Sequence, residues 1–164
     1  MSIRHATESD QLRIIEIYNQ AVETGFSTAD TEPATVESRA DWFSSHQENR
    51  YPIYVDDFEE EIRGWCSLSP YRKGRMALRY TAEISYYVDN NFQRLGIATQ
   101  LAKHAIQDCS RLHLKTLFAI ILDTNQASVV LLEKLGFESW GYLPGVADFN
   151  GVECGHNYLG KRVG

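Results

Sequence analysis

The run QRLGIA, residues 93–98, combines groups that bind phosphate. It follows a strand-like run and precedes a helical one, so the unpaired N–H groups and positive end of a helix would gather there. Gly96 would let a ligand approach the backbone, Ala98 is small, and Gln93 and Arg94 offer side-chain donors to phosphate oxygens. The run predicts an anion site. The alternative is a glycine that only eases packing of the helix onto its sheet.

Two common nucleotide-binding motifs are missing from the sequence. There is no G-x-x-x-x-G-K-[ST] loop, and no G-x-G-x-x-G is followed by an acidic residue about 20 positions later. This argues against ATP and NAD as the phosphate-containing ligand.

Asn125 and Ser128 form a second polar group, just after an apolar run. The run TLFAIIL, residues 116–122, has the length and composition of a buried central strand. An amide beyond its end can hydrogen-bond an extended ligand that follows the strand edge. Asn125 could equally cap the helix that follows, and both interpretations stay open.

Glu83 is a candidate for acid–base chemistry. It lies in the alternating run 79–88, which places Ala82, Ile84, Tyr86 and Val88 on one face and Thr81, Glu83, Ser85 and Tyr87 on the other. Partial burial would raise the proton affinity of this carboxylate. A surface carboxylate on the polar face of a strand is the alternative.

The composition bounds the remaining possibilities. A chain of 164 residues with 43% hydrophobic content is long enough for one buried core and too short for two ordinary domains, so we expect a single domain over residues 1–164. The net charge of −6 has the wrong sign for a nucleic-acid partner. No segment resembles a signal peptide or a membrane span, which predicts a cytoplasmic protein without a membrane partner.

The cysteines and histidines do not suggest a metal centre. Cys66, Cys109 and Cys154 are widely spaced and form no C-x-x-C pair, so buried reduced thiols are expected. The five histidines are scattered, and no pair has ligand spacing on one face. We predict no metal site and no disulfide.

The periodicity of apolar residues predicts a mixed α/β domain around one sheet. Thr7 and Asp10 are spaced to cap the first helix, whose buried stripe would be Leu12, Ile15, Tyr18 and Val22. The loop 24–35 is a candidate pocket wall, and the charged run 56–61 is expected to be a solvated hairpin tip. The expected strands are 2–6, 51–55, 62–68, 79–88, 116–122, 137–145 and 153–161, and the expected helices are 7–22, 36–47, 95–111 and 126–135.

The strand AEISYYV, the run QRLGIA and the run NQAS ahead of LLEKLGF resemble, in this order, the acetyl-CoA motifs of the GCN5-related N-acetyltransferase (GNAT) superfamily. The segments IYNQAV, TEP, RYTAE and YYV resemble more closely its phosphinothricin acetyltransferase subfamily, and the resemblance spans essentially the whole chain. It implies a GNAT-type domain with a twisted, mostly antiparallel central sheet that is flanked by helices and splayed at the acetyl-CoA site.

The resemblance also implies roles for individual residues. Glu83 would be the general base, acting directly or through water, and a backbone N–H near Tyr87 or Val88 would polarise the thioester carbonyl. Asn125 and Ser128 would hold the pantetheine arm of coenzyme A. Its pyrophosphate end would be held by Val88, Gln93, Arg94, Gly96, Ile97 and Ala98.

Two positions depart from the family pattern. Many members have a tyrosine in the helix before the GF turn that can protonate the departing thiolate, but residues 129–132 are VVLL, which excludes a tyrosine acid there. A histidine that assists at the acceptor site of the subfamily is matched by Cys154. His156 lies two residues later, on the same strand face, and a purely structural histidine is the alternative.

For the acceptor, Lys73 and Arg75 match the basic residues that meet the acidic part of the substrate in the resembling enzymes. An ordinary solvated loop is the alternative. The family's pocket aromatics appear here as Ala29 and Leu78, and the nearest substitutes in sequence are Phe26, Trp42 and Tyr80.

These residues lead to one principal hypothesis and two alternatives. We expect an acetyl-CoA-dependent N-acetyltransferase that acts on the amino group of a small amino acid analogue of the phosphinothricin or methionine sulfoximine type. A peptide N-terminus or a polyamine is the alternative acceptor, although Lys73 and Arg75 would repel a polycation. The third hypothesis is a non-catalytic CoA-binding module. The resemblance further implies a homodimer.

Overall fold

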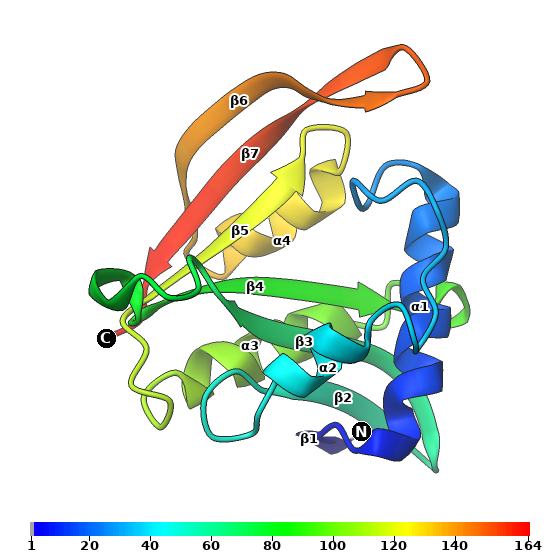
Figure 1. Cartoon of the computed structure of the whole chain (residues 1–164), viewed down its shortest axis with the longest axis vertical. Helices are drawn as coiled ribbons and strands as arrows, with labels where there is room; N and C mark the ends of the chain where they lie inside the picture. The colour runs from blue at the N-terminus through cyan, green and yellow to red at the C-terminus, as the bar shows by residue number, and fades with distance from the viewer. Residues whose placement is uncertain (1) are drawn as a thin grey trace.

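The computed structural model describes residues 2–164, in which seven strands form one sheet with helices packed against it (Figure 1). The strands are β1 Ser2–His5, β2 Ile53–Phe58, β3 Glu61–Pro70, β4 Thr81–Val88, β5 Thr116–Leu122, β6 Glu138–Phe149 and β7 Val152–Arg162. The helices are α1 Gln11–Thr24, α2 Ala40–Ser45, α3 Ile97–Asp108 and α4 Gln126–Lys134. The sheet order is β1-β2-β3-β4-β5-β7-β6, with β4 and β5 as the parallel pair in an otherwise antiparallel sheet. The mostly antiparallel sheet was predicted.

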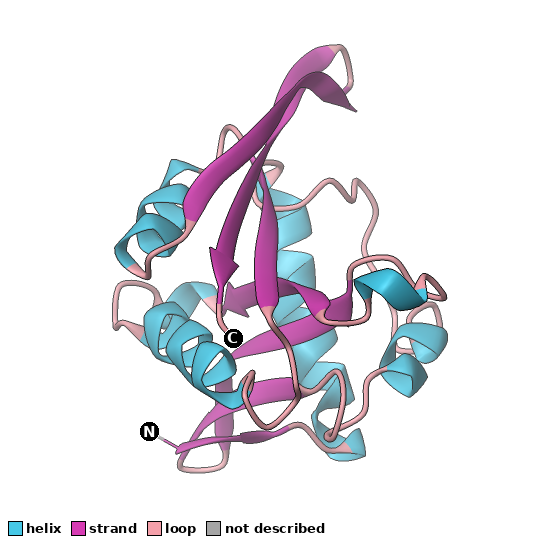
Figure 2. Cartoon of the chain, turned by 90° about the vertical axis from the view of Figure 1, so that its left-hand side faces the viewer, coloured by secondary structure: helices cyan, strands magenta, loops and turns pink. Residues whose placement is uncertain are grey.

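Helices lie on both faces of this sheet (Figure 2). Buried apolar side chains form one cluster on each face. On one face, Ile14 and Ile17 of α1 pack against Val55 and Trp65. On the other face, the cluster contains the stripe predicted for α3, namely Ile97, Leu101, Ala105 and Cys109, all buried. The sheet therefore separates the region around α1 and α2 from the region around α3 and α4.

Strands β4 and β5 pair over three residues at one end of the sheet. Residues 81–83 of β4 are in register with residues 116–118 of β5, and beyond that point the strands diverge (Figure 1). Among the strands of residues 2–164, backbone groups on the β5 side of β4 therefore have no partner from Ile84 to Val88. This opening is the splay that the resemblance implies.

The buried stripe of α1 differs from the expected one. Ile15 and Val22 are buried as predicted, but Leu12 is 63% exposed, and Ile14 and Ile17 are buried instead. The capping pair predicted at Thr7 and Asp10 is present, but it begins a 3-10 turn, Glu8–Asp10, rather than the α-helix. The α-helix begins only at Gln11. The 3-10 turn ahead of it therefore sets which side chains of the helix face the sheet.

The charged run 56–61 is only in part the solvated hairpin tip that its composition predicts, because residues 58–61 are exposed but Asp56 is not. Asp56 is fully buried and pairs with Arg63 at 2.8 Å, because β2 continues through Phe58. The turn itself is Glu59 and Glu60, both with positive φ. A buried ion pair between adjacent strands therefore replaces part of the predicted loop.

Two helices are shorter than predicted. α2 covers residues 40–45 instead of 36–47, because Thr35 and Ser38 hydrogen-bond each other in a turn ahead of it. α3 begins at Ile97 instead of residue 95, because Arg94 and Gly96 have φ values of 64° and 79° that no helix continues. No helix among residues 2–164 is long and apolar enough to cross a membrane.

Candidate active site

The N-terminus of α3 presents unpaired backbone N–H groups. The first backbone hydrogen bond of this helix runs from the Gln100 N–H to the Gly96 carbonyl at 3.0 Å, so the amides of residues 97–99 precede any intrahelical acceptor. A Cβ on Gly96 would meet no atom within 4 Å. Close packing therefore does not require this glycine. The glycine is required by the positive φ of the backbone at this position, and the space beside it is open to a ligand.

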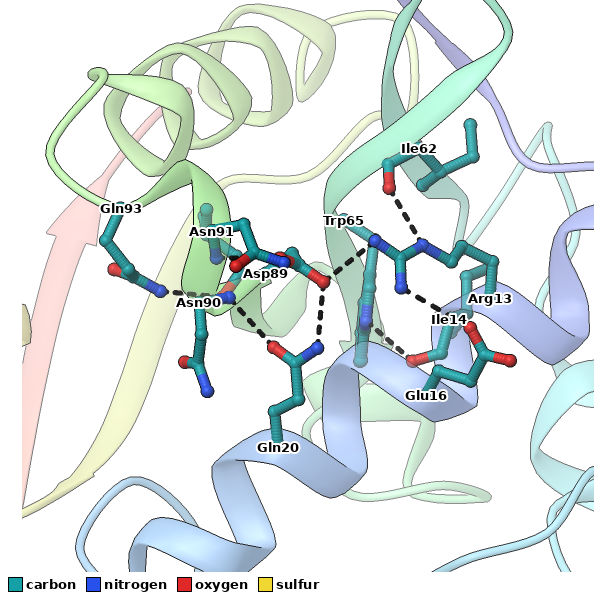
Figure 3. Close-up of polar contacts among 11 residues, drawn as sticks. Arg13, Ile14, Glu16, Gln20, Ile62, Trp65, Asp89, Asn90, Asn91 and Gln93 are labelled. Atoms are coloured by element: carbon teal, nitrogen blue, oxygen red, sulfur yellow. Dashed lines mark hydrogen bonds and ion pairs between the residues drawn. The ribbon is translucent and has the colours of Figure 1, made fainter.

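The segment between β4 and α3 is held by a buried carboxylate (Figure 3). The Asp89 side chain is 1% exposed and accepts hydrogen bonds from Arg13, Gln20 and the Asn91 N–H, each at 2.8 Å. Gln20 also accepts the Asn90 N–H at 2.8 Å. The position of this segment is thus fixed by α1, on which the sequence reasoning had placed no site residue.

The predicted phosphate-binding side chains differ in their contacts. The Gln93 amide donates to the Val88 carbonyl at 2.7 Å, so one N–H of this exposed side chain closes the turn. Arg94 is exposed beside the start of α3, and Ala98 is half-buried in its first turn. The main-chain amides and Arg94 are therefore the donors that an anion could reach directly.

Asn125 caps α4, as one of its two interpretations predicted. Its side-chain oxygen accepts the Ser128 N–H at 3.3 Å. The cap uses the amide oxygen and leaves the amide N–H₂ available to a ligand along the end of β5. Both interpretations of Asn125 are compatible with this geometry.

Glu83 lies inside a pocket of about 320 Å³ between the sheet and the helices α1 and α2. Burial raises the pKa of its carboxyl above the ordinary value. The interpretation of Glu83 as an ordinary surface carboxylate therefore does not fit the structure. The walls include Tyr18, Arg39, Trp42, Trp65 and Tyr87.

Arg39 was missed by the sequence reasoning. It is the one cation among the described residues that line the Glu83 pocket, and it pairs with Asp30. Asp30 also accepts the Tyr18 hydroxyl, and the Arg39 guanidinium lies 5.2 Å from the centre of the Tyr18 ring. Residues 18, 30 and 39 have no periodic relationship in the sequence, so only the fold brings them together.

The four predicted acceptor-binding residues lie outside this pocket. Lys73 and Arg75 line a neighbouring pocket of about 560 Å³, which shares Trp42 with the Glu83 pocket. The Tyr80 ring packs against the Arg79 guanidinium and the Lys115 ammonium, and Phe26 is 47% exposed after α1. Their role in acceptor binding stays a prediction.

His156 and Cys154 both lie on β7, and neither lines the Glu83 pocket. Cys154 is buried, as are Cys66 and Cys109, and no disulfide forms within residues 2–164. His156 is in register with Leu122 of β5 and Leu143 of β6. In the described part of the chain, no group of three or more His, Cys, Asp or Glu side chains could hold a metal ion.

Most of this site lies in the part of the chain that matches a known protein family. A family model described as the Acetyltransferase (GNAT) family matches residues 13–137. The chain belongs to this family. GNAT membership makes it an acetyl-CoA-dependent N-acetyltransferase, and the open amides at α3 and the splay beside β4 fit that co-substrate.

Individual GNAT relatives align along nearly the whole chain. The Bacillus subtilis protein YwnH, provisionally named a phosphinothricin acetyltransferase, is 36% identical over 99% of both chains. An L-methionine sulfoximine/L-methionine sulfone acetyltransferase of Pseudomonas aeruginosa is 33% identical over 88% of this chain and 84% of its own. The structure of a Sinorhizobium meliloti phosphinothricin acetyltransferase in complex with acetyl-CoA superposes with a TM-score of 0.93, covering 99% of this chain and 88% of that one at 27% identity.

Proposed function

We propose that this N-acetyltransferase acts on the primary amine of a small amino acid analogue of the phosphinothricin or methionine sulfoximine type. The observation that carries the proposal is the Glu83 pocket, which brings together a carboxylate for an amine and the guanidinium of Arg39, which is paired with Asp30 and has further N–H groups for an acidic group. The relatives named above act on acceptors of this class, according to their names. The proposal places the reaction in the cytoplasm, where acetyl-CoA and free amino acids occur together.

Glu83 is the general base of the proposed reaction. The amine gives a proton to the Glu83 carboxylate, directly or through water, because only a neutral amine has a lone pair for attack. A nitrogen–carbon bond then forms as the carbon–sulfur bond of the thioester breaks, coenzyme A leaves as a thiolate with the electron pair, and the proton that the acylated nitrogen loses neutralises that thiolate. The raised pKa of Glu83 brings its proton affinity closer to that of the amine.

Val88, rather than Tyr87, is the proposed donor to the thioester carbonyl. Successive N–H groups of a strand point to opposite edges. The Asp89 N–H donates to the Arg63 carbonyl on β3 at 2.9 Å, so the Val88 N–H points to the other edge, into the opening beside β5. Tyr87 contributes its side chain to the wall of the Glu83 pocket instead.

The same opening supports the proposed position of coenzyme A. Its diphosphate would meet the amides of residues 97–99 together with Arg94, and its pantetheine arm would pass between β4 and β5 toward Asn125 and Ser128. Gln93 would contribute by holding the turn at Val88.

A thiol-release assay with a panel of acceptors tests the proposed function. The purified protein is mixed with acetyl-CoA and with phosphinothricin, methionine sulfoximine, a peptide or a polyamine, and free thiol is followed. The proposal predicts release with the two amino acid analogues and strong loss in Glu83→Gln, with Glu61→Gln in the β2–β3 hairpin as an unaffected control. Preference for a peptide or polyamine would support the alternative acceptors, and no release with any amine would support a non-catalytic CoA-binding module.

The proposed assembly is a homodimer joined through β6 and β7. This hairpin projects beyond the rest of the chain (Figures 1 and 2). Trp140, Tyr142, Val146 and Val152 on it are 49%, 52%, 53% and 66% exposed. Several large exposed apolar side chains on one projecting hairpin are typical of a protein–protein interface.

A further inference from the structure

His46, at the end of α2, connects to the Glu83 pocket through a serine. Its Nδ1 lies 2.6 Å from the Trp42 carbonyl oxygen, and its Nε2 lies 3.0 Å from the Ser69 hydroxyl. The His46 ring also packs against the Trp42 ring, with centroids 4.3 Å apart. The imidazole is thus held in one orientation by two hydrogen bonds and one ring contact.

These contacts fix the direction of each hydrogen bond. A carbonyl oxygen only accepts, so Nδ1 carries the proton and donates it to Trp42. Burial lowers the pKa of His46, which keeps the ring neutral at neutral pH, with a single N–H. Nε2 is therefore an acceptor, and the Ser69 hydroxyl donates its hydrogen to it.

Ser69 is the direct neighbour of Glu83 on the sheet. The two residues are in register on β3 and β4, and both line the same pocket. Paired residues on one sheet face have Cβ atoms about 4.5–5.5 Å apart. Because the Ser69 hydrogen is given to His46, its oxygen presents only lone pairs to the pocket.

We propose that the Ser69 oxygen accepts an N–H of the acceptor amine and holds its nitrogen beside Glu83. His46 is then a positioning residue, because it acts only by keeping the Ser69 hydrogen out of the pocket. This inference rests on the proposed function, since it concerns the amine that Glu83 deprotonates. A primary amine suits the arrangement, because after losing its proton it retains two N–H groups and a lone pair for attack.

Steady-state kinetics of five variants, including one control and one double variant, test this proposal, with methionine sulfoximine as the acceptor. Ser69→Ala is expected to raise the acceptor KM about tenfold, the effect of one lost hydrogen bond to a charged or reacting group, with the KM for acetyl-CoA unchanged. His46→Phe keeps a ring against Trp42 but removes both nitrogens, and it is expected to raise the acceptor KM severalfold. Ser69→Thr retains the hydroxyl and is expected to stay within about threefold of the wild type.

Ser44→Ala is the matched control. The Ser44 hydroxyl lies on the same helix, donates to the Asp41 carbonyl at 3.0 Å, and lines neither the Glu83 pocket nor the pocket of Lys73 and Arg75. Its removal should leave both KM values unchanged. Thermal melts accompany every variant, and His46→Gln replaces His46→Phe if the latter does not fold.

The double variant Ser69→Ala/His46→Phe separates positioning from independent structural roles. If His46 acts through Ser69, the double variant is no worse than Ser69→Ala alone. The proposal is overturned if the two losses multiply, if the acetyl-CoA KM rises by the same factor, or if Ser69→Ala changes the acceptor KM by less than twofold. Absence of thiol release by the wild type with any amine would instead overturn the proposed function.

Discussion

The Nη2 of Arg13 on α1 lies 2.8 Å from the Oδ2 of Asp89, at the end of β4 (Figure 3). Gln20, about two turns further along α1, donates to the same oxygen. Asp89 is separated by only a few residues from the amides at the start of α3. One buried carboxylate therefore connects the helix beside the acceptor pocket with the segment proposed to bind coenzyme A.

Substitution of Asp89 should destabilise the fold. Asp89→Asn leaves Arg13 without its buried partner and should lower the free energy of unfolding by about 3 kcal/mol. Urea unfolding measures this change. Glu16→Gln is the control. Glu16 also pairs with Arg13, but its side chain is 52% exposed, so this substitution should lower the free energy of unfolding by less than about 1 kcal/mol. Equal effects of the two substitutions would contradict the importance of the buried pair.

Stability should also fall in acid because of Asp89. Burial alone would raise the pKa of its carboxyl, but the hydrogen bonds from Gln20, the Asn91 N–H and Arg13 together hold that pKa below its ordinary value. The stabilisation is therefore present above the unfolded-state pKa of about 3.9 and is lost as pH falls through the folded-state pKa. Unfolding free energies measured between pH 7 and pH 3 should fall less steeply for Asp89→Asn than for the wild type. Identical slopes would exclude this linkage.

The rate of acetyl transfer should depend on the ionisation of Glu83. A general base works only when deprotonated, so kcat/KM should fall as pH drops through the raised pKa of this carboxyl. Glu83→Gln should lower kcat/KM about 10²- to 10⁴-fold and should lack this acidic limb. A pH–rate profile of both proteins provides the measurement. An unchanged acidic limb in the variant would assign it to another group.

Glu83→Gln should at the same time stabilise the protein at neutral pH. A folded-state pKa raised above the unfolded value means that the contribution to stability is present below the unfolded pKa and is lost as pH rises through the folded pKa. At pH 7 the buried charge thus opposes folding, and the neutral amide removes it. Calorimetry should show a melting temperature a few degrees higher for the variant, with the difference vanishing near pH 4. A lower melting temperature at pH 7 would show that Glu83 is favourably paired.

The exposed hairpin predicts the oligomeric state. The wild type should sediment at about twice the chain mass of 18.7 kDa, and Trp140→Glu on β6 should shift it to the monomer. Leu12→Glu, at a 63% exposed position on α1, is the matched control and should remain dimeric. A monomeric wild type, or a dimer that tolerates Trp140→Glu, would exclude this interface.

Local patterns accounted for much of the fold and part of the candidate site. The alternation in residues 79–88 correctly placed Ala82 and Ile84 in the core, and Glu83 on the pocket side of β4. Such patterns are readable because neighbours along a strand or helix have a fixed geometry. The strand-to-helix break at residues 89–96 was recognisable for the same reason.

Contacts between distant segments were not predictable in this way. Charge alone made Asp56 look solvated, because its partner Arg63 is reached only across the β2–β3 pairing. Arg39 lines the Glu83 pocket through the path of the loop after α1, and no periodicity marks it. The resemblance supplied Lys73 and Arg75 as acceptor ligands, but residue types do not determine which of two adjoining pockets a loop will line.

Calorimetric titration with coenzyme A tests the central claim most directly, namely that the amides at the start of α3 bind its diphosphate. The wild type is predicted to bind one equivalent per chain. Gly96→Asp, which places a carboxylate where a Cβ meets no atom, should weaken binding at least about tenfold. Gly151→Asp, at another open glycine with positive φ, in the β6–β7 turn, should bind like the wild type. Absence of heat with the wild type, or equal affinities for all three proteins, would contradict the account.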